Sequence, residues 1–396
     1  MKKKIVGVAF IGCVLLGMLM GCTDKIEVSS EKVMSPVSEL RPVVKVFIEN
    51  SGSMNGYMCE GSQLKDAVFD YVSDLNGCVD STELYYINSR VIPFSGKLER
   101  YIKTLTPATF RQAGGNLQDS DLGQMIEAIL NGMNDSTVCL FVSDCILDLP
   151  ASDSQKFLNT CQISIKNTLN EARQSMSRLG VEVLKLTSDF NGRYFYQNGQ
   201  SEVLQNVQRP YYLWIFGDHR VLAQLNKEVP LKGLERYGLQ GIVAFAPEVA
   251  VPYEVSNKTT TSQVIGCENG EYIAVIRADF SATLQPENTI QDAANYAFHN
   301  PSLSLQSIQP ITAKGNPYTH CLTFTIPEST RIAQGNLTFY ASGLPGWVED
   351  SNDESGKDIR NNLMKTTGIR HLIGGVADSY KNDNVSTNFK FTVKHK

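Results

Sequence analysis

The sequence predicts an α/β fold, a doubly wound and mostly parallel sheet, followed by a C-terminal β-sandwich-like domain. Apolar, β-branched runs at residues 43–48, 138–142, 181–186 and 211–216 indicate buried strands. Between these runs, apolar residues recur at helical spacing in residues 63–75, 122–130, 153–178 and 219–225. From about residue 241 the helical spacing fades, and short alternating runs follow. Buried strands alternating with helices are typical of a sheet with helices on both faces.

The second half of the chain carries the pattern of a sandwich. Alternating runs occur at residues 272–276, 321–326, 336–340 and 389–393, and turn residues separate them. Residues 359–380 interrupt this pattern with a partly helical stretch. We therefore expect four segments: a signal peptide at 1–21, a tether at 22–41, the α/β domain at 42–235 and the β-sandwich-like domain at 236–396.

Composition excludes several classes of protein. Of 396 residues, 42% are hydrophobic, which is enough to form packed cores and excludes a disordered chain. The net charge is −5, and it becomes −8 once Lys2, Lys3 and Lys4 are removed with the predicted signal peptide. A mildly acidic chain with scattered charge lacks the basic footprint of a nucleic-acid-binding protein. One apolar segment of spanning length at the start excludes a polytopic membrane protein.

The first residues have the layout of a targeting segment. Three lysines precede an apolar stretch at 5–20, and Gly21-Cys22 follows. This resembles the lipobox of bacterial lipoproteins. The resemblance implies cleavage before Cys22, acylation of Cys22 (palmitate among its chains) and a lipid anchor in a membrane of the bacterial cell envelope, inner or outer. An ordinary secretory signal or a short anchor is the alternative.

Seven further cysteines follow Cys22, and an odd number leaves at least one unpaired within the chain. The absence of a CxxC spacing disfavours zinc or thioredoxin-like chemistry. In an oxidising compartment, Cys59 with Cys78 and Cys267 with Cys321 are candidate disulfides, although spacing alone does not establish connectivity.

Oxygen-bearing side chains gather where predicted strands end. Glu49, Ser51 and Ser53 follow the first strand, and Asp144 follows the strand at 138–142. Ser120 lies between them, just before a predicted helix. In open α/β sheets ligands collect beyond the carboxyl ends of the strands. These side chains are therefore candidates for one site.

The pattern resembles the von Willebrand factor A domain and its metal-ion-dependent adhesion site. Ser51 and Ser53 match that family's two serines, Ser120 takes its threonine position and Asp144 its final aspartate, while Glu49 stands where the family has Asp. The resemblance covers about half the chain, and the Glu and Ser departures leave the site partly degenerate. It implies a bound divalent metal at these five residues, with Mg²⁺ expected and Mn²⁺ or Ca²⁺ as alternatives.

The function expected from these features is adhesion rather than catalysis. A lipid-anchored envelope protein would hold a protein partner through the metal, with Asn55 and Tyr57 beside the serine loop as candidate partner contacts. Two alternatives stay open. One is an envelope hydrolase with its site in the loops above the sheet, and the other is a structural scaffold in which the same oxygens only cap helices and tighten turns.

Overall fold

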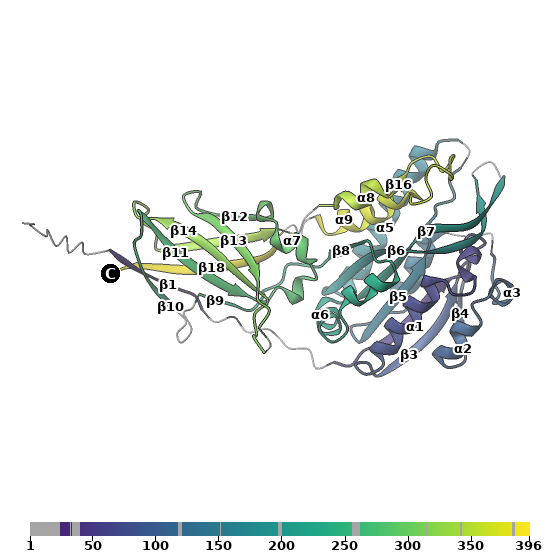
Figure 1. Cartoon of the computed structure of the whole chain (residues 1–396), viewed down its shortest axis with the longest axis horizontal. Coiled ribbons are helices and arrows are strands. Elements are labelled where there is room, and N and C mark those ends of the chain that lie inside the picture. The colour runs from purple at the N-terminus through teal and green to yellow at the C-terminus, as the bar shows by residue number, and fades with distance from the viewer. Residues whose placement is uncertain are drawn as a thin grey trace, which may run out of the picture.

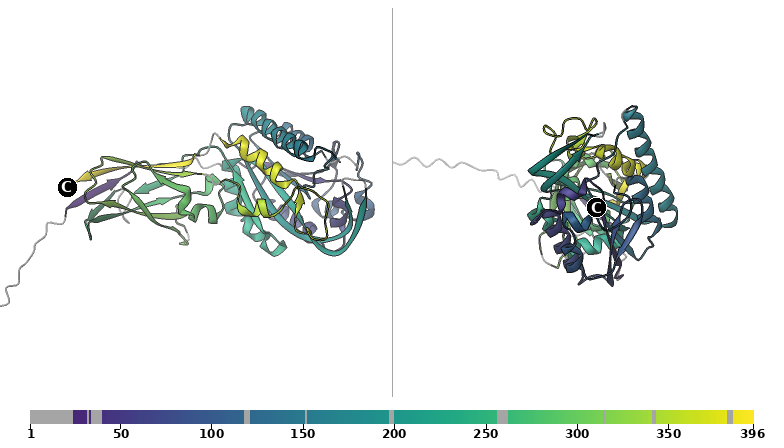
Figure 2. Two further views of the ribbon diagram at one scale, coloured as in Figure 1. Left: turned by 90° about the horizontal axis from the view of Figure 1, so that it is seen from above. Right: turned by 90° about the vertical axis from the view of Figure 1, so that its right-hand side faces the viewer.

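The computed structural model describes residues 24–31, 33, 40–117, 121–150, 152–196, 200–255, 262–313, 315–340, 343–381 and 385–396. These residues form two bodies arranged end to end in an elongated molecule (Figure 1). We call them the α/β body (residues 42–246 and 346–380) and the β body (residues 24–33, 249–340 and 385–396). The view from above in Figure 2 shows the same end-to-end arrangement.

The sheet of the α/β body has, within the described residues, seven strands in the order β4-β3-β2-β5-β7-β6-β8. β2 runs parallel to β3 and to β5, whereas all other neighbours in this sheet are antiparallel. The strands are β2 (Val43–Glu49), β3 (Ser81–Ile87), β4 (Val91–Phe94), β5 (Thr137–Ser143), β6 (Leu179–Phe195), β7 (Ser201–Asp218) and β8 (Gly241–Phe245).

The predicted doubly wound, mostly parallel sheet is therefore wrong: the sheet is mixed, and it is parallel over three strands among those described. The main reason lies in β6 and β7, which form one long hairpin from the Leu179–Asp218 pair to the Phe195–Ser201 pair. A parallel neighbour would need a crossover of a dozen or more residues between the two strands. Residues 187–210, left unassigned in the sequence prediction, instead continue both strands.

Helices cover both faces of this sheet. On one face α1, α2, α3, α6 and η2 pack over a core that includes Leu64, Tyr101 and Leu222. On the other face α4, α5, α8 and α9 pack over a core that includes Trp214 and Ile373. The helices are η1 (Met54–Met58), α1 (Gln63–Leu75), α2 (Leu98–Lys103), α3 (Pro107–Phe110), α4 (Leu122–Asn131), α5 (Ser154–Ser175), α6 (His219–Glu228), η2 (Leu231–Tyr237), α8 (Gly346–Asp350) and α9 (Ile369–Ser379).

The β body consists, where the structure describes it, of two antiparallel sheets around one core (Figure 1). Their strand orders are β10-β1-β18-β15-β12 and β13-β14-β11-β9. Alternating residues such as Phe324, Phe389 and Phe391 point into this core. The strands are β1 (Lys25–Ser29), β9 (Tyr253–Val255), β10 (Ser262–Gly266), β11 (Glu271–Ala278), β12 (Tyr296–Phe298), β13 (Ser304–Pro310), β14 (His320–Pro327), β15 (Gln334–Tyr340) and β18 (Val385–His395).

The domain boundaries differ from those expected. Residues 25–29, placed in the tether by the sequence prediction, form β1, which pairs with β10 on one side and β18 on the other. Residues 346–380, placed in the β-sandwich-like domain, belong to the α/β body. There α8 and α9 bury Val348 and Leu372 in its second core, and β16 (Asn352–Asp353) pairs with β17 (Thr366–Thr367). Both differences arise because the chain crosses between the bodies more than once.

The short helix η3 (Ser281–Thr283) of the β body meets the α/β body at the junction. α7 (Glu287–Gln291) and η4 (Ala293–Asn295) follow it along the chain. His219 Nδ1 lies 2.9 Å from the carbonyl oxygen of Ala282, and Gln285 Nε2 donates to the carbonyl of Ala244 at 3.0 Å. Gly217 directly precedes α6 and packs against Val138, near the start of β5. The sheet edge at which β5 begins therefore faces the β body.

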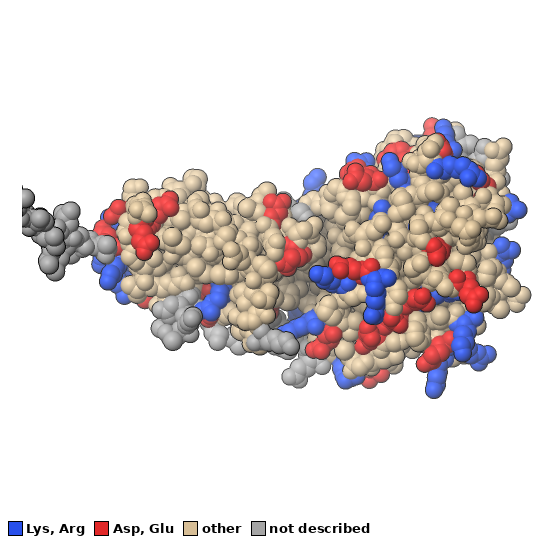
Figure 3. All heavy atoms as spheres, viewed as in Figure 1, with Lys and Arg blue, Asp and Glu red and all other residues tan. Residues whose placement is uncertain are grey.

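The seven cysteines after Cys22 are all free thiols in the structure. The candidate pairs Cys59–Cys78 and Cys267–Cys321 are therefore not disulfides here. On the face seen in Figure 3, acidic and basic side chains are interspersed over the α/β body. No large field of one sign arises on that face of the described residues.

Candidate functional site

The parallel pairing of β2 and β5 brings the ends of these strands together. Ile48 is in register with Val142, so Glu49 and Ser143 lie at the same level of the sheet. The Ser143 hydroxyl donates a hydrogen bond to Glu49 Oε2. Asp144 follows directly, and the side chains of Glu49 and Asp144 are 0% and 1% exposed. Two buried carboxyl groups thus lie at the ends of neighbouring strands, where the charge of one affects the other.

The turn after β2 supplies hydroxyl oxygens. Ser51 Oγ and Ser53 Oγ lie 3.1 Å apart, and the Gly52 amide donates to the carbonyl of Leu117 at 3.0 Å. The 3₁₀ helix η1 begins at Met54, whose sulfur accepts from the Asp144 amide at 3.1 Å. The serine loop and the turn after β5 are therefore held against each other.

Backbone strain marks the second turn. Cys145 has a φ of 54°, in the left-handed region that side-chain-bearing residues rarely adopt. Its amide donates to Ser143 Oγ at 2.7 Å, and its sulfur accepts from Trp214 Nε1 at 3.2 Å. The Ile146 amide donates to Asp144 Oδ1 at 3.3 Å. Strain of about 1–3 kcal/mol per residue persists where surrounding contacts impose it, and such positions cluster at functional sites.

Burial and like charge act together on Asp144. Removal from solvent and, to a smaller extent, the Glu49 carboxylate raise the pKa of Asp144 to about 7, although a hydrogen bond from Ser53 opposes both. Asp144 Oδ2 and both amide atoms of Asn50 are buried without a hydrogen-bond partner. A buried polar atom left unpaired costs about 1–3 kcal/mol, so this arrangement favours a proton or a cation between the carboxyl groups.

A buried arginine lies near the carboxyl groups but is held by other partners. Arg209 Nη1 donates to the carbonyls of Leu363 and Lys365 at 3.0 and 3.2 Å, and its guanidinium carbon lies 5.3 Å from the centre of the Tyr194 ring. Its positive charge lowers the pKa of Asp144 less than burial raises it. Arg209 therefore reduces the negative potential at the site without neutralising the carboxyl groups.

Of the five predicted metal ligands, the structure brings Glu49, Ser51, Ser53 and Asp144 together at the ends of β2 and β5. Ser120 lies outside the described residues, as does Cys22. In the ranges that the structure describes, no three His, Cys, Asp or Glu side chains form a group that could hold a metal ion. A cation at this site would therefore depend on hydroxyl and amide oxygens as well as on two carboxylates.

Asn55 and Tyr57, the predicted partner contacts, are buried, which contradicts that prediction. Tyr57 OH donates to the carbonyl of Pro210, and its ring packs edge-on against Phe190. Asn55 is 7% exposed, and its amide, oriented to satisfy both atoms, bonds the Pro107 carbonyl and the side chain of Arg111. Tyr57 thus holds η1 against the hairpin of β6 and β7, and Asn55 holds it against α3 and the residue that follows.

The sequence prediction missed the surface that does border the serine loop. Phe195, at the tip of β6, is 46% exposed, and a Cβ added at Gly52 would lie 3.5 Å from its ring. Val203, also exposed, pairs with Arg193 on the same face of the hairpin. The run of three aromatic residues at 194–196 is a strand signal that could have located this hairpin.

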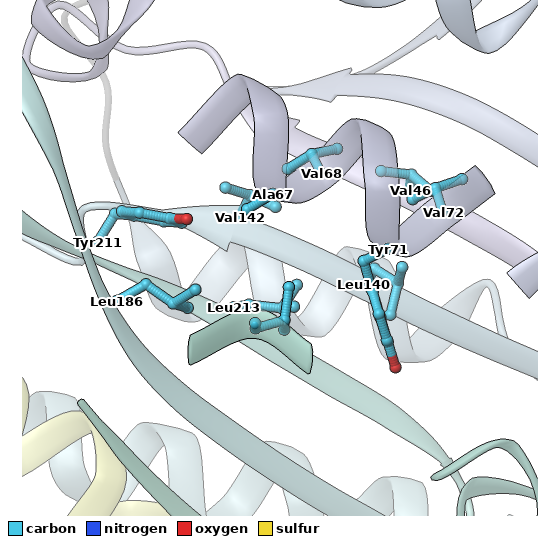
Figure 4. Close-up of a pocket in the computed structure, with 11 residues that line it drawn as sticks. Val46, Ala67, Val68, Tyr71, Val72, Leu140, Val142, Leu186, Tyr211 and Leu213 are labelled. Atoms are coloured by element: carbon cyan, nitrogen blue, oxygen red, sulfur yellow. The ribbon is translucent and has the colours of Figure 1, made fainter. Parts of the chain in front are cut away.

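A cavity of about 320 Å³ between α4 and α5 is lined by Leu122, Asp148 and Ser164. An open groove of about 1050 Å³ in the β body is lined by Tyr253, His299 and Lys390. A void of about 10 Å³ between α1 and the sheet is lined by apolar side chains such as Val68, Leu140 and Tyr211 (Figure 4), far below the 300 Å³ or more of a ligand pocket. The buried His219, His320 and His371 lie against Ala282 O, Glu287 and the Gln162–Glu354 pair, respectively.

Each helix in the described ranges is too short or too polar to cross a bilayer. Comparison with known proteins finds neither a protein-family model nor a curated protein that matches the chain.

Proposed function

We propose that this protein is a lipid-anchored adhesion protein of the bacterial cell envelope, and that it binds a divalent cation between Glu49 and Asp144 and holds a protein partner through that ion. One observation carries the proposal: two buried carboxyl groups adjoin, while Asp144 Oδ2 and the Asn50 amide have no partner. The proposal retains the oxygen donors predicted from the sequence. It does not depend on a doubly wound sheet.

The donor chemistry fits a hard cation. Carboxylate oxygens of Glu49 and Asp144, hydroxyls of Ser51 and Ser53 and the amide oxygen of Asn50 are all oxygen ligands, which Mg²⁺ and Ca²⁺ prefer. Mg²⁺ is the first candidate because its sites use few protein carboxylates. When bound, the ion would supply positive charge and an open ligand position for an oxygen of the partner.

Burial explains why a cation would be favoured over two separate charges. Two buried carboxylates repel each other, and each loses hydration. A proton shared by the pair relieves the repulsion but leaves the Asn50 amide unpaired. A divalent cation relieves the repulsion and engages the amide oxygen as well.

Titration calorimetry with Mn²⁺ and Mg²⁺ tests the cation site. We expect one ion per chain in the wild type, and binding at least ten-fold weaker in Asp144→Asn and Glu49→Gln. Asp148→Asn, which alters an exposed carboxylate four residues further along, is the matched control and should bind as the wild type does. Absence of binding in the wild type, or equal binding in Asp144→Asn, would refute the site.

The anchor and the partner need separate tests. Palmitate labelling should be lost in Cys22→Ala, and persistent labelling would exclude Cys22 as the acylated residue. Crosslinking in intact cells, with and without EDTA, should recover the partner from the wild type but not from Asp144→Asn. Recovery that is indifferent to both EDTA and the substitution would assign partner binding to another surface, as in the scaffold alternative.

A further inference from the structure

We infer that the β body stands end-on on the membrane and acts as a rigid spacer that holds the cation site at the far end of the molecule. The inference rests on the proposed acylation of Cys22. It adds the orientation of the protein on the lipid surface and the distance at which a partner is met.

The first step is that the segment between the lipid anchor at Cys22 and the first strand of the β body is short. Only two residues separate Cys22 from Lys25, the first residue of β1, and the three Cα–Cα steps between them span at most about 11 Å. The carbonyl of Asp24 already accepts from the Cys267 amide at 3.1 Å, so ordered contacts begin before the strand does. The β body therefore cannot move far from the headgroups.

The second step is that β1 cannot lengthen this connecting segment by leaving its sheet. It is an inner strand, hydrogen-bonded to β10 along residues 25–29 and to β18 along residues 26–29. Ile26 and Val28 are fully buried in the core of the β body. Releasing β1 would expose both side chains and break two strand ladders, so the strand stays in place.

The third step is the position of the anchored end. The Lys396 amide donates to the carbonyl of Lys25 at 2.8 Å, so the start of β1 and the end of β18 lie together at one tip. Figure 1 shows this tip at the end of the molecule opposite the α/β body. Its exposed side chains carry both signs, with Lys396 paired to Glu27 at 3.2 Å. The acyl chains, rather than a basic patch, would hold the tip to the bilayer.

The fourth step is the position of the cation site. β18 runs from the junction, where the Val249 amide bonds Ser386, to the anchored tip. β5 starts on the junction side, beside Gly217, and ends at Ser143. The site adjoins η1, which bonds α3 through Asn55, and α3 lies at the end of the molecule remote from the β body (Figure 1).

The lengths of two strands give the distance between the membrane and the cation site. The 11 residues of β18 and the 7 of β5 span about 35 Å and about 20 Å at roughly 3.3 Å per residue. Taken end to end they place the cation site on the order of 50 Å above the headgroups. The partner that the site holds is accordingly one presented well away from this membrane, and not a membrane-embedded surface beside the anchor.

Energy transfer to a membrane acceptor tests the orientation. Full-length acylated protein would be reconstituted into vesicles of phosphatidylethanolamine and phosphatidylglycerol that carry an acceptor lipid. A genetically encoded fluorescent donor would replace either exposed Asn269, near the tip, or exposed Phe195, beside the site. With a pair whose range is shorter than the molecule, we expect transfer several-fold more efficient from position 269 than from position 195.

Equal transfer from the two positions would mean that the protein lies flat on the bilayer, and it would overturn the inference. Failure of the wild type to associate with vesicles would overturn the anchor and, with it, the orientation. Asp144→Asn should leave both transfer efficiencies unchanged even as it removes cation binding. If the wild type keeps this orientation but binds no Mn²⁺, the spacer is supported and the cation site is refuted.

Discussion

The hydroxyl of Ser143 connects the Cys145 amide to the carboxylate of Glu49, and so links the ends of two parallel strands. This places Asp144, the residue between Ser143 and Cys145, against a second buried carboxyl group.

The unfolding free energy of the metal-free protein should fall as pH rises through the acidic range. Asp144 has a pKa near 4 when unfolded, and burial raises its pKa to about 7 when folded. Between these values the folded state binds the extra proton, so stability is lost as pH increases, by on the order of 3 kcal/mol. Denaturation by urea in EDTA at pH 5 and pH 8 measures this loss. Asp144→Asn should reduce it, and Mg²⁺ should restore stability at pH 8 in the wild type only.

Glu182 in β6 contributes a second, independent pH dependence. It is 1% exposed, burial raises its pKa to about 7, and Asn226 donates to its Oε1 at 2.7 Å. The folded pKa lies above the unfolded one, so stability again declines from about pH 4.5 to about pH 7. Glu182→Gln should stabilise the protein at pH 8 by about 1–3 kcal/mol without altering Mn²⁺ affinity. The exposed Glu127→Gln serves as control, and equal effects of the two substitutions would contradict the assignment.

Gly56→Ala should damage the site through packing. A Cβ at Gly56 would lie 2.3 Å from the Phe190 ring, and Gly192 packs against the Gly56 backbone. Overpacking of this kind costs about 1–3 kcal/mol and would shift η1, which follows the serine loop. We expect a lower urea midpoint together with weaker Mn²⁺ binding. Gly233→Ala, where a Cβ meets nothing within 4 Å, should change neither quantity.

Phe195→Ala should separate partner binding from cation binding. The ring is nearly half exposed and adjoins Gly52, so its removal should alter stability by no more than about 0.5 kcal/mol. Mn²⁺ affinity should stay at the wild-type value, while recovery of the crosslinked partner falls several-fold. Undiminished recovery would show that the hairpin tip takes no part in the contact.

Local pattern sufficed for many individual elements. The helix predicted at 63–75 is α1 with the same bounds, and the strand predicted at 138–142 lies within β5. The residues at the ends of β2 and β5 could be grouped because parallel neighbours end at the same edge of a sheet. Apolar periodicity and the succession of strands along the chain are local properties that a single sequence reveals.

Long-range pairing decided the rest. The alternation of Ile26 and Val28 is visible in the sequence, but its partners lie more than 200 residues away, in β10 and β18, and no local signal names them. The same holds for the antiparallel direction of β6 and β7 and for the burial of Asn55 and Tyr57 beneath them. The order of residues along the chain places the oxygen-bearing side chains directly after β2 and β5. The burial of Glu49 and Asp144, in contrast, follows from the folded structure, because removal from water depends on which distant segments pack over them.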